Sequence, residues 1–262
     1  RLNNENAQSL AEICSRLDGI PLAIELAAAR IKVLTVEKIC ERLVNRFSLL
    51  TGGKRTALPR QQTLKAMIDW SYDLLSEKEK ILWRRLSVFN GGWTLESAEE
   101  ICSDDKIKRE EIVDLMNALT DKSIILYGTE KERYRILESL KQYGNDTLTD
   151  AFEKEEILKK HLTFFMEIAE ASVPNLIGSE IQINLEKLLS EHGNFQSAIE
   201  WSLSADETEK GARLAVALGN FWDIRGYYTL GIQLLGRFLT STKGLNKSLE
   251  ISLRRFSGIL SA

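Results

Sequence analysis

Apolar residues recur every three to four positions along nearly the whole chain, which is the spacing of one face of an amphipathic helix. Three prolines, Pro21, Pro59 and Pro174, interrupt this rhythm. Pro59 and Pro174 lie in loop-like stretches, so we use them as approximate domain markers. The pattern predicts a mainly α-helical protein.

The first segment predicts a small helical bundle. Its first helix carries one apolar stripe, formed by Leu10, Ile13, Cys14 and Leu17. Gly19 suits the left-handed position after that helix, because glycine adopts it most easily. Pro21 suits the first turn of a second helix, where a missing N–H removes no hydrogen bond, and this helix continues to about Arg30. Thr35 can cap a third helix. The inner face of the third helix is expected to hold Ile39, Leu43 and Phe47.

From about residue 60 the pattern changes. A helix is expected over 63–75, and the next one begins at Ser76-Glu77-Lys78-Glu79, which has the spacing of a capping box. A Gly91-Gly92 turn then leads to Thr94, which can cap a helix over 95–102.

A change of period follows a further helix expected over 109–120. Two short strand-like runs, 123–127 and 133–136, flank a polar turn that begins at Gly128, and this arrangement predicts a β-hairpin. A last helix is expected over 138–149. Helices followed by a hairpin describe a winged-helix domain, with the wing as the only sheet that the sequence predicts.

The third segment is predicted to be helical throughout, with short gaps that make neighbouring helices antiparallel. The stretch from Ala215 to Tyr228 resembles a tetratricopeptide helix–turn–helix, although strict 34-residue self-similarity is absent. We therefore expect the start of a degenerate, TPR-like repeat array. The helices are expected over 155–171, 180–191, 194–204, 209–224, 226–240 and 246–260.

Composition narrows the class of protein. The chain has 262 residues, of which 44% are hydrophobic and 28% charged, as in an ordinary globular protein. The formal net charge of −3 gives no basic field for nucleic acid or anionic lipid. No uninterrupted apolar run reaches ~18 residues, and no signal-peptide pattern opens the chain. These features predict a cytoplasmic protein without a membrane partner.

The three cysteines, Cys14, Cys40 and Cys102, lack metal-binding spacing, and two histidines cannot complete a zinc cluster. We expect no metal site, and we expect the cysteines to be small core residues in a reducing compartment. The chain begins without methionine, at Arg1 and inside a helical pattern, which suggests a fragment of a longer protein.

No catalytic residue emerges from the sequence. Residues 52–56 superficially suggest a phosphate-binding loop, but Ser48 replaces its first glycine and Arg55 follows its lysine. We therefore expect that the segment is not an enzyme by itself. Any ATP hydrolysis by the full protein would need residues upstream of Arg1.

Three stretches, in order, resemble one family. Gly19-Ile20-Pro21-Leu22-Ala23, within residues 17–28, resembles the GLPLA element that closes the nucleotide site in STAND signalling ATPases of the NB-ARC kind. Residues 70–75 and 86–89 resemble the opening of that family's winged helix. Residues 121–125 with 134–138 resemble its hairpin and the position of its MHD motif.

Residues 55–59 and 60–64 further resemble bacterial transcriptional regulators of the LuxR and AfsR kind. The resemblance implies three domains: residues 1–55 as the helical domain of the NB-ARC module, 56–150 as the winged helix, and 151–262 as a truncated TPR-like repeat region.

The family resemblance implies an ADP/ATP switch. ADP would lie between three domains: an upstream P-loop domain of the same chain, the helical domain and the winged helix. The P-loop domain would supply Mg²⁺. Exchange for ATP would release the winged helix and permit assembly into a homo-oligomer. The nucleotide-binding turn would comprise Gly19, Ile20, Pro21 and Leu22, with the Pro21 ring on the adenine. The segment alone should bind nucleotide poorly.

Ser123 matches a serine that reaches the phosphates in related proteins. The MHD position is occupied here by Ile136, Leu137 and Glu138. Leu137 stands where the family has histidine, and leucine cannot donate a hydrogen bond. Direct phosphate sensing is therefore not expected from Leu137, and Arg133 or Arg135 is the alternative.

Two other functions compete with the switch. The winged helix suggests DNA binding, but its candidate helix, residues 108–117, carries three carboxylates against Lys108 and Arg109, which disfavours contact with phosphates. DNA contact is expected rather through another domain. The second alternative is a helical scaffold without nucleotide function, which binds a protein or small-molecule inducer on its repeats. Aromatic residues that either line a peptide groove or form packing seams are Phe195, Trp201, Phe221, Trp222, Tyr227 and Tyr228.

Overall fold

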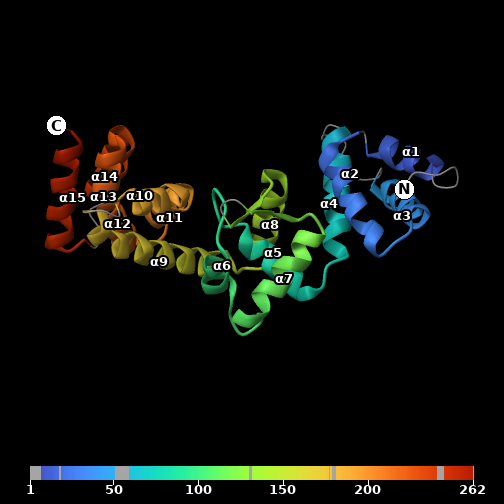
Figure 1. Ribbon diagram of the computed structural model, residues 1–262, viewed down its shortest axis with the longest axis horizontal. Helices are drawn as coiled ribbons and strands as arrows, with labels where there is room; N and C mark the ends of the chain where they lie inside the picture. The colour runs from blue at the N-terminus through green and yellow to red at the C-terminus, as the bar shows by residue number, and fades with distance from the viewer. Residues whose placement is uncertain are drawn as a thin grey trace.

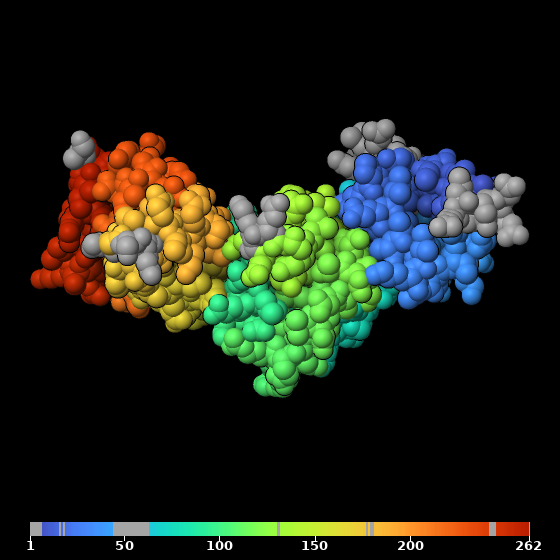
Figure 2. Space-filling model, viewed as in Figure 1, coloured from blue at the N-terminus to red at the C-terminus, as the bar shows by residue number. Residues whose placement is uncertain are grey.

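The computed structural model describes residues 7–17, 19–50, 59–129, 132–176, 178, 181–240 and 245–261. This part of the chain is mainly α-helical and contains one two-stranded antiparallel sheet, which confirms the predicted fold class. Three groups of elements follow one another from the N-terminus to the C-terminus in an elongated molecule (Figures 1 and 2).

The first group is a helical bundle, as predicted. Gly19 has a φ of 64° and Pro21 is the first residue of the second helix. The hydroxyl of Thr35 accepts the N–H of Lys38 at 3.4 Å, so it caps the third helix. Phe47 and Asp18 lie outside the residues whose side chains the structure describes. The elements are α1 (Ala7–Arg16), α2 (Pro21–Ala28), the 3-10 turn η1 (Ala29–Lys32) and α3 (Val36–Leu50).

Cys14 is exposed, and its prediction as a core residue was wrong. Ile13 and Leu17 are buried and lie four positions apart, on one line of the helix. Cys14 is turned about 100° away from Ile13 around the helix axis, out of that line. The other two cysteines, Cys40 and Cys102, are buried as predicted.

Helix α4 (Pro59–Asp73) links the first group to the second. The interpretation of Pro59 as part of a loop was wrong, because Pro59 begins this helix, where its missing N–H is tolerated. α4 packs against α2 and α3, and Tyr72 near its end contacts Trp83 edge-on, with 5.6 Å between ring centroids. α4 thus belongs to both cores. The predicted boundary at residues 55 and 56 lies outside the described residues.

The second group holds the hairpin. Both predicted helix caps are confirmed, at Ser76 with Glu79 and at Thr94 with Ser97. The predicted helix over 109–120 begins with a 3-10 turn, Arg109–Glu111. The expected first strand began too early, since pairing starts at Ile125. The elements are α5 (Glu77–Leu86), α6 (Leu95–Cys102), α7 (Ile112–Asp121), β1 (Ile125–Gly128), β2 (Arg133–Ile136) and α8 (Glu138–Asp150).

In the third group the described residues form helices joined by short turns, as predicted. The expected helix over 209–224 is divided at Leu218 into two helices. Pro174 lies in a 3-10 turn, Val173–Leu176, that extends α9, so Pro174 does not lie in a loop-like stretch as predicted. The helices are α9 (Lys154–Ser172), α10 (Ile181–Ser190), α11 (His192–Ser204), α12 (Thr208–Ala217), α13 (Gly219–Arg225), α14 (Tyr228–Thr240) and α15 (Lys247–Leu260).

Helix α9 connects the second and third groups, since it packs against α6 and α8 as well as α11 and α12 (Figure 1). The aromatic residues of the third group mostly form the core. Phe195, Phe221 and Trp222 are fully buried, whereas Tyr228 is exposed. The packing-seam interpretation therefore holds for the buried three.

Candidate functional site

The turn before α2 is exposed and has no side-chain cap. The Gly19 N–H donates to the Cys14 carbonyl at 3.1 Å, and the Ile20 N–H donates to the Leu17 carbonyl at 2.9 Å. Ile20 occupies the cap position without offering a side-chain acceptor, and the Pro21 ring is exposed. Leu22 is half-buried. Because the first N–H groups of a helix lack intrahelical partners, this turn can receive a ligand.

Ser123 lies at the end of α7 and not in a strand as expected. Its φ is 57°, and the Ile124 N–H donates to the Leu119 carbonyl at 3.0 Å. This bond spans five residues, so Ser123 occupies the left-handed position that ends many helices. The side chain is half-buried, and its hydroxyl makes no hydrogen bond with the described residues.

The antiparallel register brings Ser123 and Leu137 to the same end of the hairpin. Ile125 pairs with Ile136, and Ser123 precedes the first strand by two residues while Leu137 follows the second strand directly. Leu137 is half-buried and caps α8 without a side-chain hydrogen bond, and Glu138 is exposed.

The end of α7, next to Ser123, and helix α4 contact the first group through η1, the 3-10 turn that follows α2. Lys32 and Asp121 form an ion pair with 2.6 Å between Nζ and Oδ1, and both side chains are more than 60% exposed. Arg30 is buried and donates to the Ser71 carbonyl at 3.3 Å; burial lowers the pKa of Arg30. Pro21 lies about 13 Å along the helix from Arg30.

The structure therefore brings Ser123 and Leu137 together, but it leaves the Gly19–Leu22 turn apart from them. Among the described residues, no hydrogen bond or ion pair joins that turn to the hairpin end.

Of the two arginines considered for phosphate sensing, Arg133 is already engaged. Its guanidinium donates to the Glu191 carboxylate at 3.0 Å and to the Gly92 carbonyl at 3.1 Å. Arg135 is exposed and forms no ion pair in the part of the chain that the structure describes. It lines a cavity of about 230 Å³ together with Glu138 and Lys141.

Two polar joints between the hairpin group and the repeats were not predicted. In the first, the fully buried Asn194 donates to the Gly92 carbonyl at 2.9 Å, and its side-chain oxygen accepts the Asn90 N–H at 2.7 Å. Gly193 permits this close approach, because a Cβ at this position would lie only 2.6 Å from the backbone carbonyl oxygen of Asn90. The Arg133–Glu191 pair adds to the same joint.

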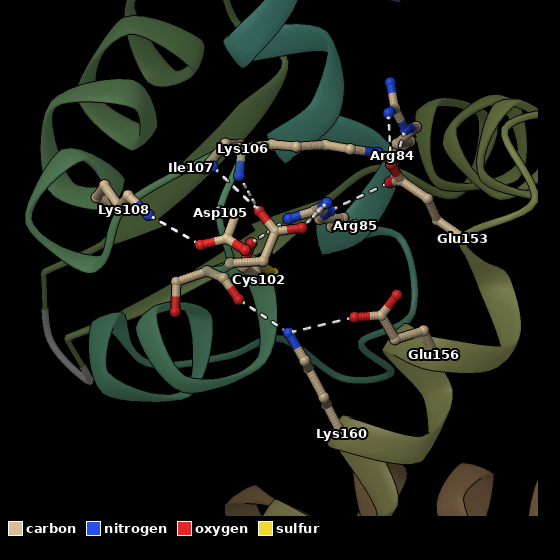
Figure 3. Close-up of polar contacts among 12 residues, drawn as sticks. Arg84, Arg85, Cys102, Asp105, Lys106, Ile107, Lys108, Glu153, Glu156 and Lys160 are labelled. Atoms are coloured by element: carbon tan, nitrogen blue, oxygen red, sulfur yellow. Dashed lines mark hydrogen bonds and ion pairs between the residues drawn. The ribbon is translucent and has the colours of Figure 1, made fainter.

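The second joint centres on Glu153, the residue before α9 (Figure 3). Its carboxylate accepts from Arg84 at 2.9 and 3.1 Å, from Arg85 at 3.2 Å and from Lys106 at 2.6 Å. Burial disfavours the charged carboxylate, but these hydrogen bonds outweigh burial and lower the pKa of Glu153 to about 2. The cluster therefore keeps Glu153 ionised.

The Arg85 side chain extends this cluster toward α6. Only 2% of the side chain is exposed, and it donates to Asp104 at 2.6 Å and to the Cys102 carbonyl at 2.7 Å. The Arg85 guanidinium holds the pKa of Asp104 well below its usual range. Both joints link residues far apart in the sequence, and no local motif marks either of them.

Other functions find less support in the geometry. Arg109 pairs with Glu99 and Glu100, and Lys108 pairs with Asp105, so nearby acids engage the two cations of the candidate DNA-reading helix. Within the described ranges, no group of three His, Cys, Asp or Glu side chains is arranged to hold a metal ion. None of the described helices has the length and apolarity needed to cross a membrane.

Comparison with known proteins finds similar proteins, some of which are named as transcriptional regulators. A Mycobacterium tuberculosis protein named as a putative HTH-type transcriptional regulator is 35% identical over 238 residues, which is 90% of this chain and 27% of that protein. An uncharacterized protein of the same species is 38% identical over 167 residues, 62% of this chain and 42% of that protein. The chain thus spans less than half the length of these relatives. No family model matches the chain.

A solved structure, that of a STAND protein with a tetratricopeptide repeat sensor from Pyrococcus horikoshii, aligns with 14% identity and a TM-score of 0.40. The alignment covers 87% of this chain and 36% of the Pyrococcus chain. The predicted similarity to bacterial transcriptional regulators is confirmed by the mycobacterial relatives.

Proposed function

We propose that this chain is the regulatory segment of a nucleotide-switched transcriptional regulator of the STAND class. In this proposal, α1–α3 close a nucleotide site, the hairpin group acts as the winged helix, and α9–α15 form the sensor. The names of the mycobacterial relatives support a regulatory role, and the ordered motifs support the switch.

The observation that carries the proposal is the contrast between the two joints of the hairpin group. Toward the repeats, buried clusters around Asn194 and Glu153 tie the two groups together. Toward the first group, α4 packs against α2 and α3 and the buried Arg30 donates to the Ser71 carbonyl. The ion pair that the described residues place at this joint, Lys32–Asp121, is exposed, and exposed pairs contribute little. This joint, which has no buried ion-pair cluster among the described residues, is where a switch would open, with the hairpin and the repeats moving together.

The nucleotide would be ADP or ATP, gripped at its phosphates, with Mg²⁺, by a P-loop domain of the full protein. The uncapped start of α2 would form the adenine wall, with the exposed Pro21 ring against the base. The described residues supply no group for hydrolysis, and we assign no catalytic role to this segment.

DNA binding is proposed for another part of the full protein, because the cations of the 108–117 helix are engaged by acids. The inducer, a protein or a small molecule, would bind the repeats, and release of the hairpin group would permit homo-oligomer assembly. A scaffold without nucleotide function replaces this proposal if the coding sequence upstream contains no P-loop.

The test is ADP retention by the full protein with Pro21→Ala. Alanine would remove about 40 Å² of apolar contact with the adenine, which at ~25 cal/mol per Å² is about 1 kcal/mol of binding free energy. This loss predicts roughly fivefold faster ADP release. Pro174→Ala, a second exposed proline in the repeats, is the matched control and should release ADP at the wild-type rate. Equal ADP release by the wild type and both variants would refute the adenine-wall assignment.

A further inference from the structure

Arg30 is a buried arginine without a carboxylate partner among the described residues. It lies in η1, directly after α2, and only 2% of the residue is exposed. Its guanidinium donates to the Ser71 carbonyl at 3.3 Å, beyond the usual range of about 2.7–3.2 Å, and its Nε has no acceptor in the described part of the chain. A buried charge is costly unless it is both paired and hydrogen-bonded. Arg30 is not paired, and its hydrogen bonding is weak.

The acid whose charge acts on Arg30 is occupied elsewhere. Glu79 favours the Arg30 cation, but burial outweighs this attraction and lowers the pKa of Arg30. Glu79 is itself buried, and its carboxylate accepts hydrogen bonds from Lys122 and from the Ser76 N–H, the latter at 2.7 Å. Because Lys122 pairs with Glu79, this carboxylate does not neutralise the Arg30 guanidinium directly.

Ser71 adds a second unmet group to the same contact. Its side chain is fully buried, and its hydroxyl has no hydrogen-bond partner among the described residues. Water hydrates both the hydroxyl and the guanidinium when η1 and the end of α4 are apart. Closing the contact therefore removes water from two polar groups and returns one long hydrogen bond.

One attraction works against this cost. The Ser71 carbonyl lies in the last turn of α4, and a cation is favoured near the C-terminus of a helix. That attraction contributes less than the removal of an unpaired ion from water costs in a protein interior. We therefore expect the net effect of Arg30 on the closed contact to be unfavourable.

Arg85 shows how a second buried arginine of this chain is held. Its side chain is also 2% exposed, but it donates to Asp104 at 2.6 Å, to Glu153 at 3.2 Å and to the Cys102 carbonyl at 2.7 Å. These carboxylates raise the pKa of Arg85 although burial lowers it. Arg30 and Arg85 are thus similarly buried, and they differ in whether acids compensate the charge.

We propose that Arg30 is a release element, whose unpaired guanidinium destabilises the contact between η1 and the end of α4 and thereby favours its opening. The biological meaning of this element rests on the proposed function, in which the same joint opens on nucleotide exchange. The P-loop domain and bound ADP would hold the joint closed, and Arg30 would regain water when that hold is lost. The physical effect of Arg30 needs no nucleotide, so it can be tested separately.

Thermal unfolding of the chain, followed by circular dichroism, tests the sign of the effect. Arg30→Met removes the charge at similar length and should raise the melting temperature by about 2–4 °C. Arg85→Met, the matched control, should lower it by at least as much, because it leaves Asp104 and Glu153 without Arg85. Arg30→Lys keeps a charge and should melt at or below the wild-type temperature. An Arg30→Met variant that melts at or below the wild-type temperature overturns the proposal, since Arg30 would then stabilise the end of α4.

A distance measurement tests whether the stabilisation lies at this joint. Val33 is 77% exposed beside η1 and Asn117 is exposed on α7, so spin labels at Val33→Cys and Asn117→Cys, with Cys14→Ser, lie on its two sides. Without nucleotide, Arg30→Met should shorten or narrow the distance distribution relative to the same labelled chain with Arg30. An unchanged or broader distribution overturns the proposal. Failure here leaves the adenine-wall assignment of Pro21 standing, and failure of that assignment leaves the effect of Arg30 standing.

Discussion

Replacing Glu153 with glutamine removes the charge at the centre of the joint between the hairpin group and the repeats. The carboxylate is 8% exposed and accepts four hydrogen bonds, from Arg84, Arg85 and Lys106. Glutamine keeps the size but leaves Arg84 and Lys106 without the carboxylate that pairs with them, and leaves Arg85 with Asp104 alone. Removing one partner of a buried ion pair costs about 3–5 kcal/mol.

Two features reduce that figure. Lys106 is 57% exposed and can turn to water, and Arg85 keeps its bond to Asp104. We therefore expect Glu153→Gln to lower the free energy of unfolding by about 3 kcal/mol. Urea denaturation followed by tryptophan fluorescence measures the change. Glu155→Gln, an exposed carboxylate in the first turn of α9, is the control and should change stability by less than ~1 kcal/mol. A Glu153→Gln variant within ~0.5 kcal/mol of wild type would refute the reasoning.

Three further predictions follow from the same structure. The pKa of Glu153 is lowered from 4.5 to about 2 in the folded state, so its stabilisation exists above pH 4.5 and is lost as pH falls toward 2; urea denaturation should show the gap between wild type and Glu153→Gln closing over that range, and a gap that widens would contradict it. Asn194→Ala should cost about 1–3 kcal/mol in urea, because it leaves the Asn90 N–H without its acceptor and leaves the Gly92 carbonyl with Arg133 as its remaining donor; a loss below ~0.5 kcal/mol would show that water replaces the amide. Ellman's reagent should label Cys14 at once but Cys102 only on unfolding, since burial raises the pKa of Cys102 to about 12; rapid labelling of Cys102 would contradict its burial.

What the sequence predicts well is decided by neighbouring residues. The caps at Ser76 and Thr94 and the turn at Gly19 depend on side chains and backbone within four positions, and each was predicted correctly. The break at Leu218 was missed, because Leu218 keeps a right-handed helical backbone and the apolar spacing continues across it, although Gly219 follows directly. Local patterns therefore give the helices but not every interruption.

Ser123 shows why site geometry is harder to predict. The β-branched and apolar residues that follow Ser123 favour a strand. In the structure Ser123 instead ends α7, because the Ile124 N–H donates to the Leu119 carbonyl. The joints at Glu153 and Asn194 join residues about 50 to 100 positions apart, and only the fold brings them together. A single sequence carries no signal for such pairs.

The central claim, a nucleotide-dependent opening between the first group and the hairpin group, is tested most directly by a distance measurement. Spin labels at Val33→Cys and Asn117→Cys, both exposed positions near the Lys32–Asp121 joint, would report that distance in the full protein with Cys14→Ser. We expect a short, narrow distance distribution with ADP and a longer or broader one with ATP. Identical distributions with the two nucleotides would contradict the account.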